Sequence, residues 1–233
     1  MARKPQRSRP AAKERPALPP PTGTDRDKIV AAFMGLLAEK RFEEIGFGDI
    51  AARSGLTLAN CRAEFGSTLA ILAAYTKDLD RKVLASGSGD MAEEPPRERL
   101  FDVLMRRIEA MGPQREAMRS LMRSVQCNPG LALALNGLGA RSQSWMLTAA
   151  DIDAAGPRGV IRAQGLAMLF ASVLRTWVDD DEDNARTMAA LDRALARGQR
   201  WSGMLDDLCR FSPGRFMRRR RRSRYDEEDA EAA

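Results

Sequence analysis

The sequence has 233 residues, of which 38 are Lys or Arg, 32 are Asp or Glu and none is His, giving a formal net charge of +6. This length suits one or two domains with a substantial hydrophobic core. The absence of His excludes a Ser-His-Asp triad, a Cys-His pair and His-ligated zinc, and with them most familiar hydrolases. No arrangement of the Asp, Glu, Lys and Cys side chains suggests a catalytic site. We therefore expect no enzyme activity, no metal and no cofactor.

The cysteines and the hydropathy of the chain favour a cytoplasmic location. Cys61, Cys127 and Cys209 lie 66 and 82 residues apart and form no CxxC pair. This spacing fits buried thiols in a reducing compartment better than disulfides or a metal cluster. No apolar run reaches the roughly 18 residues that cross a bilayer, and the first residues lack the apolar core of a signal peptide. We expect no membrane partner.

Most of the positive charge lies at the two ends of the chain. Residues 1–23 hold six Lys or Arg against one Glu, and residues 213–233 hold seven Arg against five acids. Residues 24–212 are almost neutral, with 25 basic and 26 acidic side chains. The first segment also contains six Pro and few large apolar residues. Such segments bury too little surface to fold, so we expect a disordered basic arm and a disordered Arg-rich, then acidic, tail. Aiding solubility and attracting nucleic acid are equally open as their roles.

Between these segments the apolar residues recur with helical spacing, and no convincing strand is found. Thr24 or Asp25 can cap a first helix, whose apolar face consists of Ile29, Phe33, Leu36 and Leu37. Further helices are expected at 47–54, 58–65, after Ser67 to about 84, and at 97–111, 114–126, 129–149 and 158–178. A last helix carries Met188, Leu191, Leu195, Leu205 and Leu208. Pro96, Pro113, Pro129 and Pro157 stand where a helix could begin.

The segment GSGDMAEEPP at 87–96 is a linker by composition. It divides a small N-terminal domain, residues 24–86, from a larger C-terminal domain, residues 97–212. The fold class that we expect is therefore all-α with two helical domains.

The most informative segment is FGDIAARSGLTLANCRAEF at 47–65, which has the spacing of a helix-turn-helix motif. Such a motif needs a small residue where its helices touch, a glycine in the turn and apolar residues behind the second helix. The residues that meet these needs are Ile50, Ala51, Gly55, Leu56, Cys61 and Phe65. The residues Thr57, Leu58, Ala59, Asn60 and Arg62 would then face a major groove. A helical hairpin packed as ordinary core fits the same pattern.

Residues 26–84 resemble the DNA-binding domain of TetR-type repressors, in the order of a first helix, an IA-x-x-x-G turn and a recognition helix that ends in an aromatic residue. The resemblance implies a homodimeric repressor that binds double-stranded DNA at an inverted repeat, with half-sites about 34–36 Å apart. It also implies an unknown small-molecule effector that shifts the dimer to a form whose recognition helices no longer match the operator.

Individual DNA-binding roles follow from the chemistry of the side chains. Asn60 can pair with adenine through two hydrogen bonds, Thr57 can cap the helix or contact a phosphate, and Arg62 can contact either a base or a phosphate. Ser67 and Thr68, at the start of the fourth helix, complete the expected DNA-binding set.

Two further sites are expected in the C-terminal domain. The effector pocket is expected to be lined by Met118, Met122, Trp145, Met146, Met168 and Phe170, because Met and aromatic side chains adapt to apolar ligands. The dimer interface is expected to consist of Leu166, Leu169, Phe170, Val173, Leu174, Trp177, Leu191 and Leu195. Core packing is a competing interpretation of both sets.

Departures from the TetR-type pattern motivate an alternative function. Arg41 stands where the family usually has Gly, and Ile45 where a Thr usually meets a phosphate. Arg62, Ala63 and Glu64 replace the usual Tyr and His of the recognition helix, and Thr68 stands where a Lys usually opens the fourth helix. Phosphate contacts supply much of DNA affinity. The alternative is therefore a TetR-like fold that has lost operator binding and serves as a lipid- or metabolite-binding accessory protein.

Overall fold

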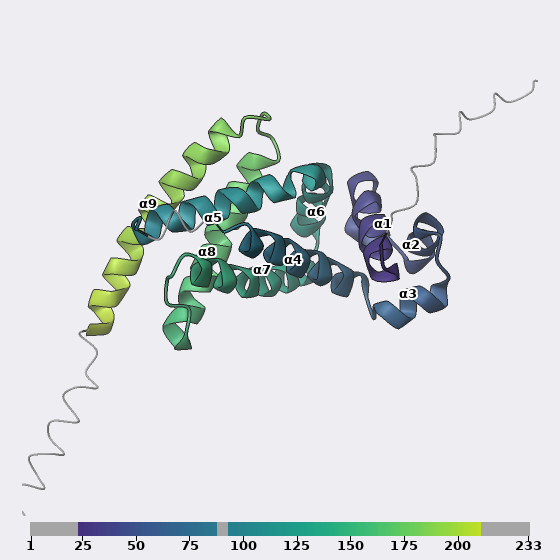
Figure 1. Ribbon diagram of the computed structural model, residues 1–233, viewed down its shortest axis with the longest axis horizontal. Helices are drawn as coiled ribbons and strands as arrows, with labels where there is room; N and C mark the ends of the chain where they lie inside the picture. The colour runs from purple at the N-terminus through teal and green to yellow at the C-terminus, as the bar shows by residue number, and fades with distance from the viewer. Residues whose placement is uncertain (1–22, 88–92, 211–233) are drawn as a thin grey trace, which may run out of the picture.

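The computed structural model describes residues 23–87 and 93–210, with side chains of the last helix described as far as Gly198. Every regular element in these residues is a helix, which confirms the all-α prediction (Figure 1). The elements are α1 (Asp25–Glu39), η1 (Phe42–Glu44), α2 (Phe47–Ser54), α3 (Leu58–Glu64), α4 (Thr68–Ala85), α5 (Pro96–Met111), η3 (Gly112–Gln114), α6 (Arg115–Cys127), α7 (Pro129–Ala149), α8 (Gly156–Trp177) and α9 (Ala185–Arg210). Residues 88–92, which are half of the predicted linker, lie outside the described residues. So do residues 1–22 of the basic arm and the whole predicted C-terminal tail.

Capping residues begin the helices largely where the sequence predicts. The Thr24 hydroxyl accepts a hydrogen bond from the Asp27 backbone N–H, and the Asp27 carboxylate accepts one from the Thr24 N–H. Ser67 caps α4 through its hydroxyl, which accepts from the Ala70 backbone N–H at 3.1 Å. These contacts satisfy N–H groups that have no partner inside a helix. Pro113 differs from expectation, because it lies in the 3-10 turn η3 and α6 begins two residues later.

The helices α1, α2 and α3 lie together at one end of the molecule, and α4 leads from them into the body formed by α5 to α9 (Figure 1). The two parts touch directly, because α1 packs against α6. Two hydrogen bonds cross this contact: the Ser120 hydroxyl donates to the Lys40 carbonyl at 2.7 Å, and the Phe42 N–H donates to the Ser124 hydroxyl at 3.0 Å. These contacts hold α6 against the end of α1 and the turn that follows it.

The apolar stripe of α8, predicted as a dimer interface, belongs instead to the core of the single chain. Leu166, Phe170, Val173, Trp177, Leu191 and Leu195 are buried, and Leu169 and Leu174 are half-buried against the same core. The physical reason is that this face of α8 packs against α7 and α9 of its own chain. The six buried residues are therefore enclosed by their own chain, whereas Leu169 and Leu174 keep part of their surface exposed.

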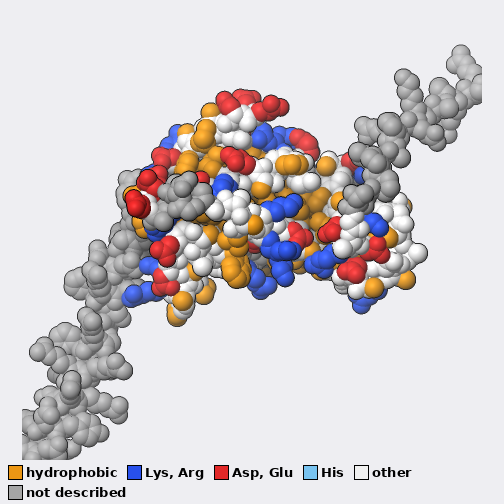
Figure 2. All heavy atoms as spheres, viewed as in Figure 1, with side chains coloured by type: hydrophobic (Ala, Val, Ile, Leu, Met, Phe, Trp, Pro, Cys, Tyr) orange, Lys and Arg blue, Asp and Glu red, His pale blue; other side chains and the backbone are white. Residues whose placement is uncertain are grey.

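No helix among the described residues is long and apolar enough to span a bilayer. Acidic side chains gather at the end of the molecule where α8 turns into α9, and basic side chains lie along the opposite edge, beneath α4 and α7 (Figure 2).

Within that acidic turn, Asp180 fixes the start of α9. Its carboxylate accepts hydrogen bonds from the backbone N–H of Thr187 at 2.7 Å, from the Thr187 hydroxyl at 2.5 Å and from Nε of Arg186 at 2.9 Å. Burial alone would raise the pKa of Asp180, but these hydrogen bonds outweigh it and lower the pKa to about 2.

This shift predicts an acid-sensitive contribution to stability. Because the folded pKa of Asp180 lies below its ordinary value of 3.8, the contribution is complete above about pH 4 and disappears as the pH falls toward 2. We expect Asp180→Asn to lower the urea unfolding midpoint at pH 7 and to have a much smaller effect near pH 2. A difference between the two proteins that does not change with pH would contradict this assignment.

Candidate nucleic-acid interface

The α2–α3 segment adopts the geometry that a helix-turn-helix requires. Gly55 lies in the left-handed region with φ 72°, and the N–H groups of Gly55 and Leu56 both donate to the Ala51 carbonyl at 3.0 and 3.2 Å. This closes α2 with a glycine in a conformation that other residues rarely adopt. Thr57 then caps α3, accepting from the Asn60 backbone N–H at 3.1 Å. The predicted turn and the predicted cap are both present.

The inner face of the motif is buried as predicted. Ile50, Ala51, Cys61 and Phe65 are buried, and Leu56 is half-buried against the core. The Arg26 guanidinium of α1 lies 4.8 Å from the centre of the Phe65 ring. This contact joins the end of α3 to α1 and adds a cation–π attraction to the apolar packing.

The outer face of α3 is exposed to solvent. Thr57, Leu58, Ala59, Asn60 and Arg62 are all exposed, so each predicted reading residue is accessible from solvent. Ser67 is exposed and uses its hydroxyl to cap α4, and Thr68 is half-buried beside it.

The Asn60 side chain is held by two neighbours. Its amide nitrogen donates to the Asp25 carboxylate of α1 at 3.1 Å, and its amide oxygen accepts from the Thr57 hydroxyl. The bond from Asn60 also lowers the pKa of Asp25, assisted by Lys28. One amide hydrogen and one carbonyl lone pair of Asn60 remain for a base. Asn60 is therefore pre-oriented, but a carboxylate lies beside it.

The charge of this region is unfavourable for general attraction to DNA. Residues 24–65 contain six Lys or Arg and seven Asp or Glu. Four of the six cations form ion pairs: Lys28 with Asp25, Lys40 with Asp49, Arg41 with Glu43, and Arg53 with Glu39. Arg62 has no hydrogen bond or ion pair with the part of the chain that the structure describes. It is therefore the cation of α3 that is available to a phosphate or a base.

Ile45, which stands where the TetR-type pattern usually has a Thr, is a buried residue. The side chain is 5% exposed and packs in the core beneath α2. An apolar, buried residue cannot donate to a phosphate, so this position contributes to folding rather than to DNA affinity.

A separate cavity of about 550 Å³ lies among α4, α5, α6, α7 and α8. It brings together four of the residues predicted for the effector pocket: Met118, Met122, Met168 and Phe170. Trp145 is not among its lining residues and is 55% exposed, and Met146 is fully buried beside Arg107. Sequence reasoning missed Tyr75, Arg107 and Gln143, which line the cavity with polar groups.

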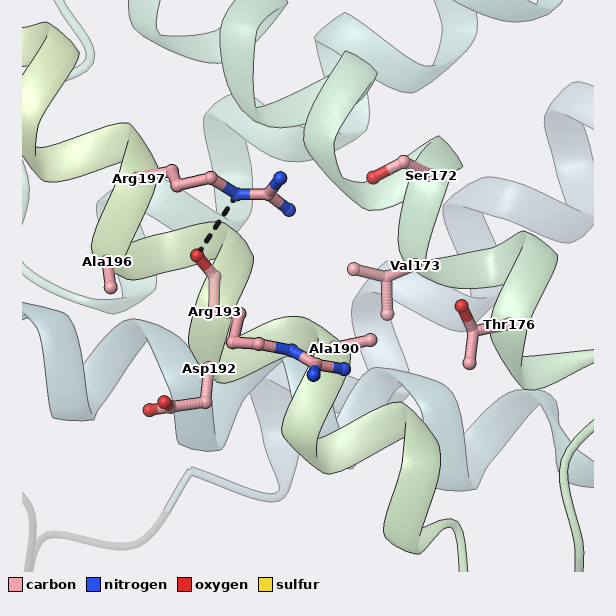
Figure 3. A pocket seen from close by; sticks show the side chains of 8 residues that line it. All are labelled: Ser172, Val173, Thr176, Ala190, Asp192, Arg193, Ala196 and Arg197. Carbon is pink, nitrogen blue, oxygen red and sulfur yellow. Dashed lines mark hydrogen bonds between the residues drawn. The ribbon is translucent and has the colours of Figure 1, made fainter.

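A shallow groove lies between α8 and α9 on the surface of the molecule. It is lined by Ser172, Val173, Thr176, Ala190, Asp192, Arg193, Ala196 and Arg197. Figure 3 shows the arginine side chains extending from α9, with Nε of Arg197 donating to the Arg193 carbonyl at 3.3 Å.

The neighbouring exposed side of α8 carries Val160, Ile161, Gly165 and Met168. These residues lie on the helix face opposite the buried stripe, which is the signal in the sequence that could have identified them.

Solved structures with a similar fold include two regulators. A TetR transcriptional regulator from Nitrosomonas europaea aligns with a TM-score of 0.59 and 22% identity, covering 74% of this chain and 96% of the other. A TetR transcriptional regulator from Rhodococcus sp. RHA1 aligns with a TM-score of 0.53 and 17% identity, covering 74% and 94%. No protein-family model and no curated protein matches the sequence. The chain therefore has the fold of TetR transcriptional regulators.

Proposed function

We propose that this protein is a TetR-type transcriptional repressor of the cytoplasm that binds double-stranded DNA through α3. The observation that carries the proposal is the exposed outer face of α3, where Asn60 and Arg62 stand on a helix positioned by a glycine turn and a buried inner face. A short recognition helix with small and hydrogen-bonding side chains suits the major groove.

The start of α1 supports this assignment. Asn60 bonds to Asp25, the first residue of α1, so α1 begins beside the recognition helix. Residues 1–22 join at this point and carry six Lys or Arg. Their charge would reach the DNA beside α3 and supply the counterion-release affinity that the near-neutral residues 24–65 lack.

A homodimer on an inverted repeat is the second element of the proposal. The exposed Ile161, Gly165 and Met168 of α8 lie on one face, with Ile161 60% and Met168 63% exposed. Large apolar side chains grouped on a surface are typical of protein interfaces, and a small residue between them lets two helices approach closely. A two-fold axis beside α8 would present two copies of α3 to successive turns of DNA.

The third element is release by a small molecule in the cavity. The cavity is lined in part by α6, and α6 is bonded to the DNA-binding part through Ser120 and Ser124. A ligand that favours a different position of α6 would shift the relative position of the two recognition helices.

One observation favours the second candidate, a ligand-binding accessory protein without an operator. The exposed surface of α3 carries Glu64 as well as Arg62, and Asp25 lies against Asn60. Negatively charged side chains that face the phosphates weaken DNA binding. The cavity would retain its role in such a protein.

The deciding experiment is selection of bound sequences from random duplex DNA by the full-length protein at near-physiological salt. Two matched variants accompany it: one with the six Lys and Arg of residues 1–22 replaced by Gln, the other with the seven Arg of residues 213–233 replaced by Gln. We expect an enriched inverted repeat with all three proteins, and weaker binding with the first variant. Absence of enrichment, with all binding lost in the variants, would favour the accessory protein.

Once an operator is selected, Asn60→Ala is expected to relax preference at one base pair by about 1–3 kcal/mol. Asp25→Ala is the matched test of the neighbouring carboxylate and is expected to raise affinity, because a negative charge leaves the interface. Both effects are measured by fluorescence anisotropy on the operator and on single-base variants of it. If neither substitution changes binding, α3 does not read the sequence.

Arg62→Ala is expected to weaken binding to operator and non-operator DNA alike, and to reduce the slope of log affinity against log salt by about 1. The control is Arg53→Ala on α2, because Arg53 is already paired with Glu39. An unchanged salt slope in Arg62→Ala, or an equal change in both variants, would show that Arg62 makes no phosphate contact.

A further inference from the structure

Three buried polar atoms without a hydrogen-bond partner among the described residues belong to side chains that line the cavity between α4 and α8. They are Oη of Tyr75 on α4, Nε of Arg107 on α5 and Oε1 of Gln143 on α7. Arg107 is 5% exposed and Gln143 is 2% exposed. Buried polar atoms in folded proteins nearly always have partners, so a group of three around one cavity requires an explanation. A ligand that supplies the missing partners is such an explanation.

A buried ion pair holds these side chains in one region. Arg107 pairs with Asp80 of α4, and the Ser142 hydroxyl donates to the same oxygen of Asp80 at 2.7 Å. Ser142 directly precedes Gln143, and Asp80 lies on the same helix as Tyr75. The ion pair and the Ser142 hydrogen bond therefore connect α4, α5 and α7, the three helices that carry the unpaired atoms.

This end of the cavity is polar without being charged overall. Asp80 neutralises Arg107, and burial raises the pKa of Tyr75 to about 12 despite the opposing effect of Arg107, so the phenol keeps its proton at neutral pH. The ligand then meets donors from Arg107 and Tyr75 and an acceptor on Gln143. A hydroxyl or an amide both accepts and donates. A carboxylate only accepts, and it would bring a buried negative charge that no unpaired cation at this end balances.

The rest of the lining is mainly apolar. Met118 and Met122 of α6 face Leu135 of α7 and Leu174 of α8 around the same space. A volume of about 550 Å³ falls within the range of small-molecule sites, about 300–1,000 Å³. Flexible Met side chains adapt to different apolar shapes.

We propose that this cavity binds an uncharged, mainly apolar molecule whose one polar end is a hydroxyl or an amide, held by Tyr75, Arg107 and Gln143. This inference rests on the ligand response proposed above and names the chemistry of its ligand. An anionic ligand would place its charge elsewhere, at the exposed Arg123 and Arg175 of the rim.

The test is calorimetric titration of the purified full-length protein with decanol, decanamide and decanoate, which share an apolar chain and differ at the polar end. We expect decanol or decanamide to bind at least about tenfold more tightly than decanoate. Equal or tighter binding of decanoate, or no binding of any of the three, would overturn the proposal. Because the titration contains no DNA, its outcome is independent of whether α3 recognises an operator.

Gln143→Leu separates a binding role from a structural one. We expect it to lower affinity for the tighter ligand about five- to tenfold, while the free protein unfolds at a higher urea concentration because a buried unpaired atom has been removed. The matched control is Gln126→Leu, since Gln126 lines the exposed part of the same cavity. It should leave both quantities unchanged. Unchanged affinity in Gln143→Leu would show that the polar end is not held there.

Discussion

Asp80→Ala is expected to destabilise the protein by about 3–5 kcal/mol, because it leaves the Arg107 guanidinium buried without a counter-ion. Asp80 and Arg107 are 8% and 5% exposed, and their ion pair connects α4 with α5. Ser142 would lose its acceptor as well, so α7 would be affected. The measurement is the free energy of unfolding in urea at one fixed protein concentration.

Two comparisons show whether burial is the cause. Asp102→Ala removes the partner of Arg106 on the surface of α5, where the Arg106 and Asp102 side chains are 22% and 33% exposed, and should cost less than about 1 kcal/mol. Replacing both members of the buried pair, as Asp80→Leu with Arg107→Met, should recover much of the loss because no unpaired charge remains. If Asp80→Ala costs no more than Asp102→Ala, the pair is unimportant for folding.

The helices could be predicted because their ends are determined locally. Thr24, Gly55 and Ser67 act on backbone groups within a few residues, and the structure shows each of them at the terminus where the sequence places it. The inner face of α3 was predictable for the same reason, since Cys61 and Phe65 follow the helical period. Local chemistry was thus sufficient to predict the helices and the exposed outer residues of α3.

Contacts between distant segments could not be predicted. Periodicity marks Leu166 to Trp177 as one apolar face, but it does not say whether that face packs on its own chain or on a second copy. The bond between Asn60 and Asp25 joins residues 35 positions apart, and no local pattern signals it. The polar end of the cavity was missed for a related reason. An arginine is expected at the surface, and nothing in the sequence indicates that Asp80 pairs with Arg107 in the interior.

The start of α8 depends on Gly159, whose role no sequence pattern indicates. Gly159 is buried in the first turns of the helix, and a Cβ added there would lie 1.9 Å from the carbonyl oxygen of Ala154 and 2.0 Å from its carbonyl carbon. Both atoms belong to the backbone of the loop before α8, so no side-chain rotation relieves the clash. The loop or the helix start must move, and the half-buried Ile152 and Ala154 would be displaced from the core.

We therefore expect Gly159→Ala to destabilise the protein by about 1–3 kcal/mol, as overpacking of a filled site does. The matched control is Gly137→Ala in the middle of α7, where an added Cβ has no neighbour within 4 Å. There Ala should stabilise the helix by about 0.5–1 kcal/mol, because Gly loses more backbone freedom on folding. The free energies of unfolding of the two variants should thus differ by about 1.5–4 kcal/mol. Helix propensity alone would predict that both substitutions stabilise the protein. Equal stabilisation by the two substitutions would mean that the 150–155 loop does not pack on α8 as described.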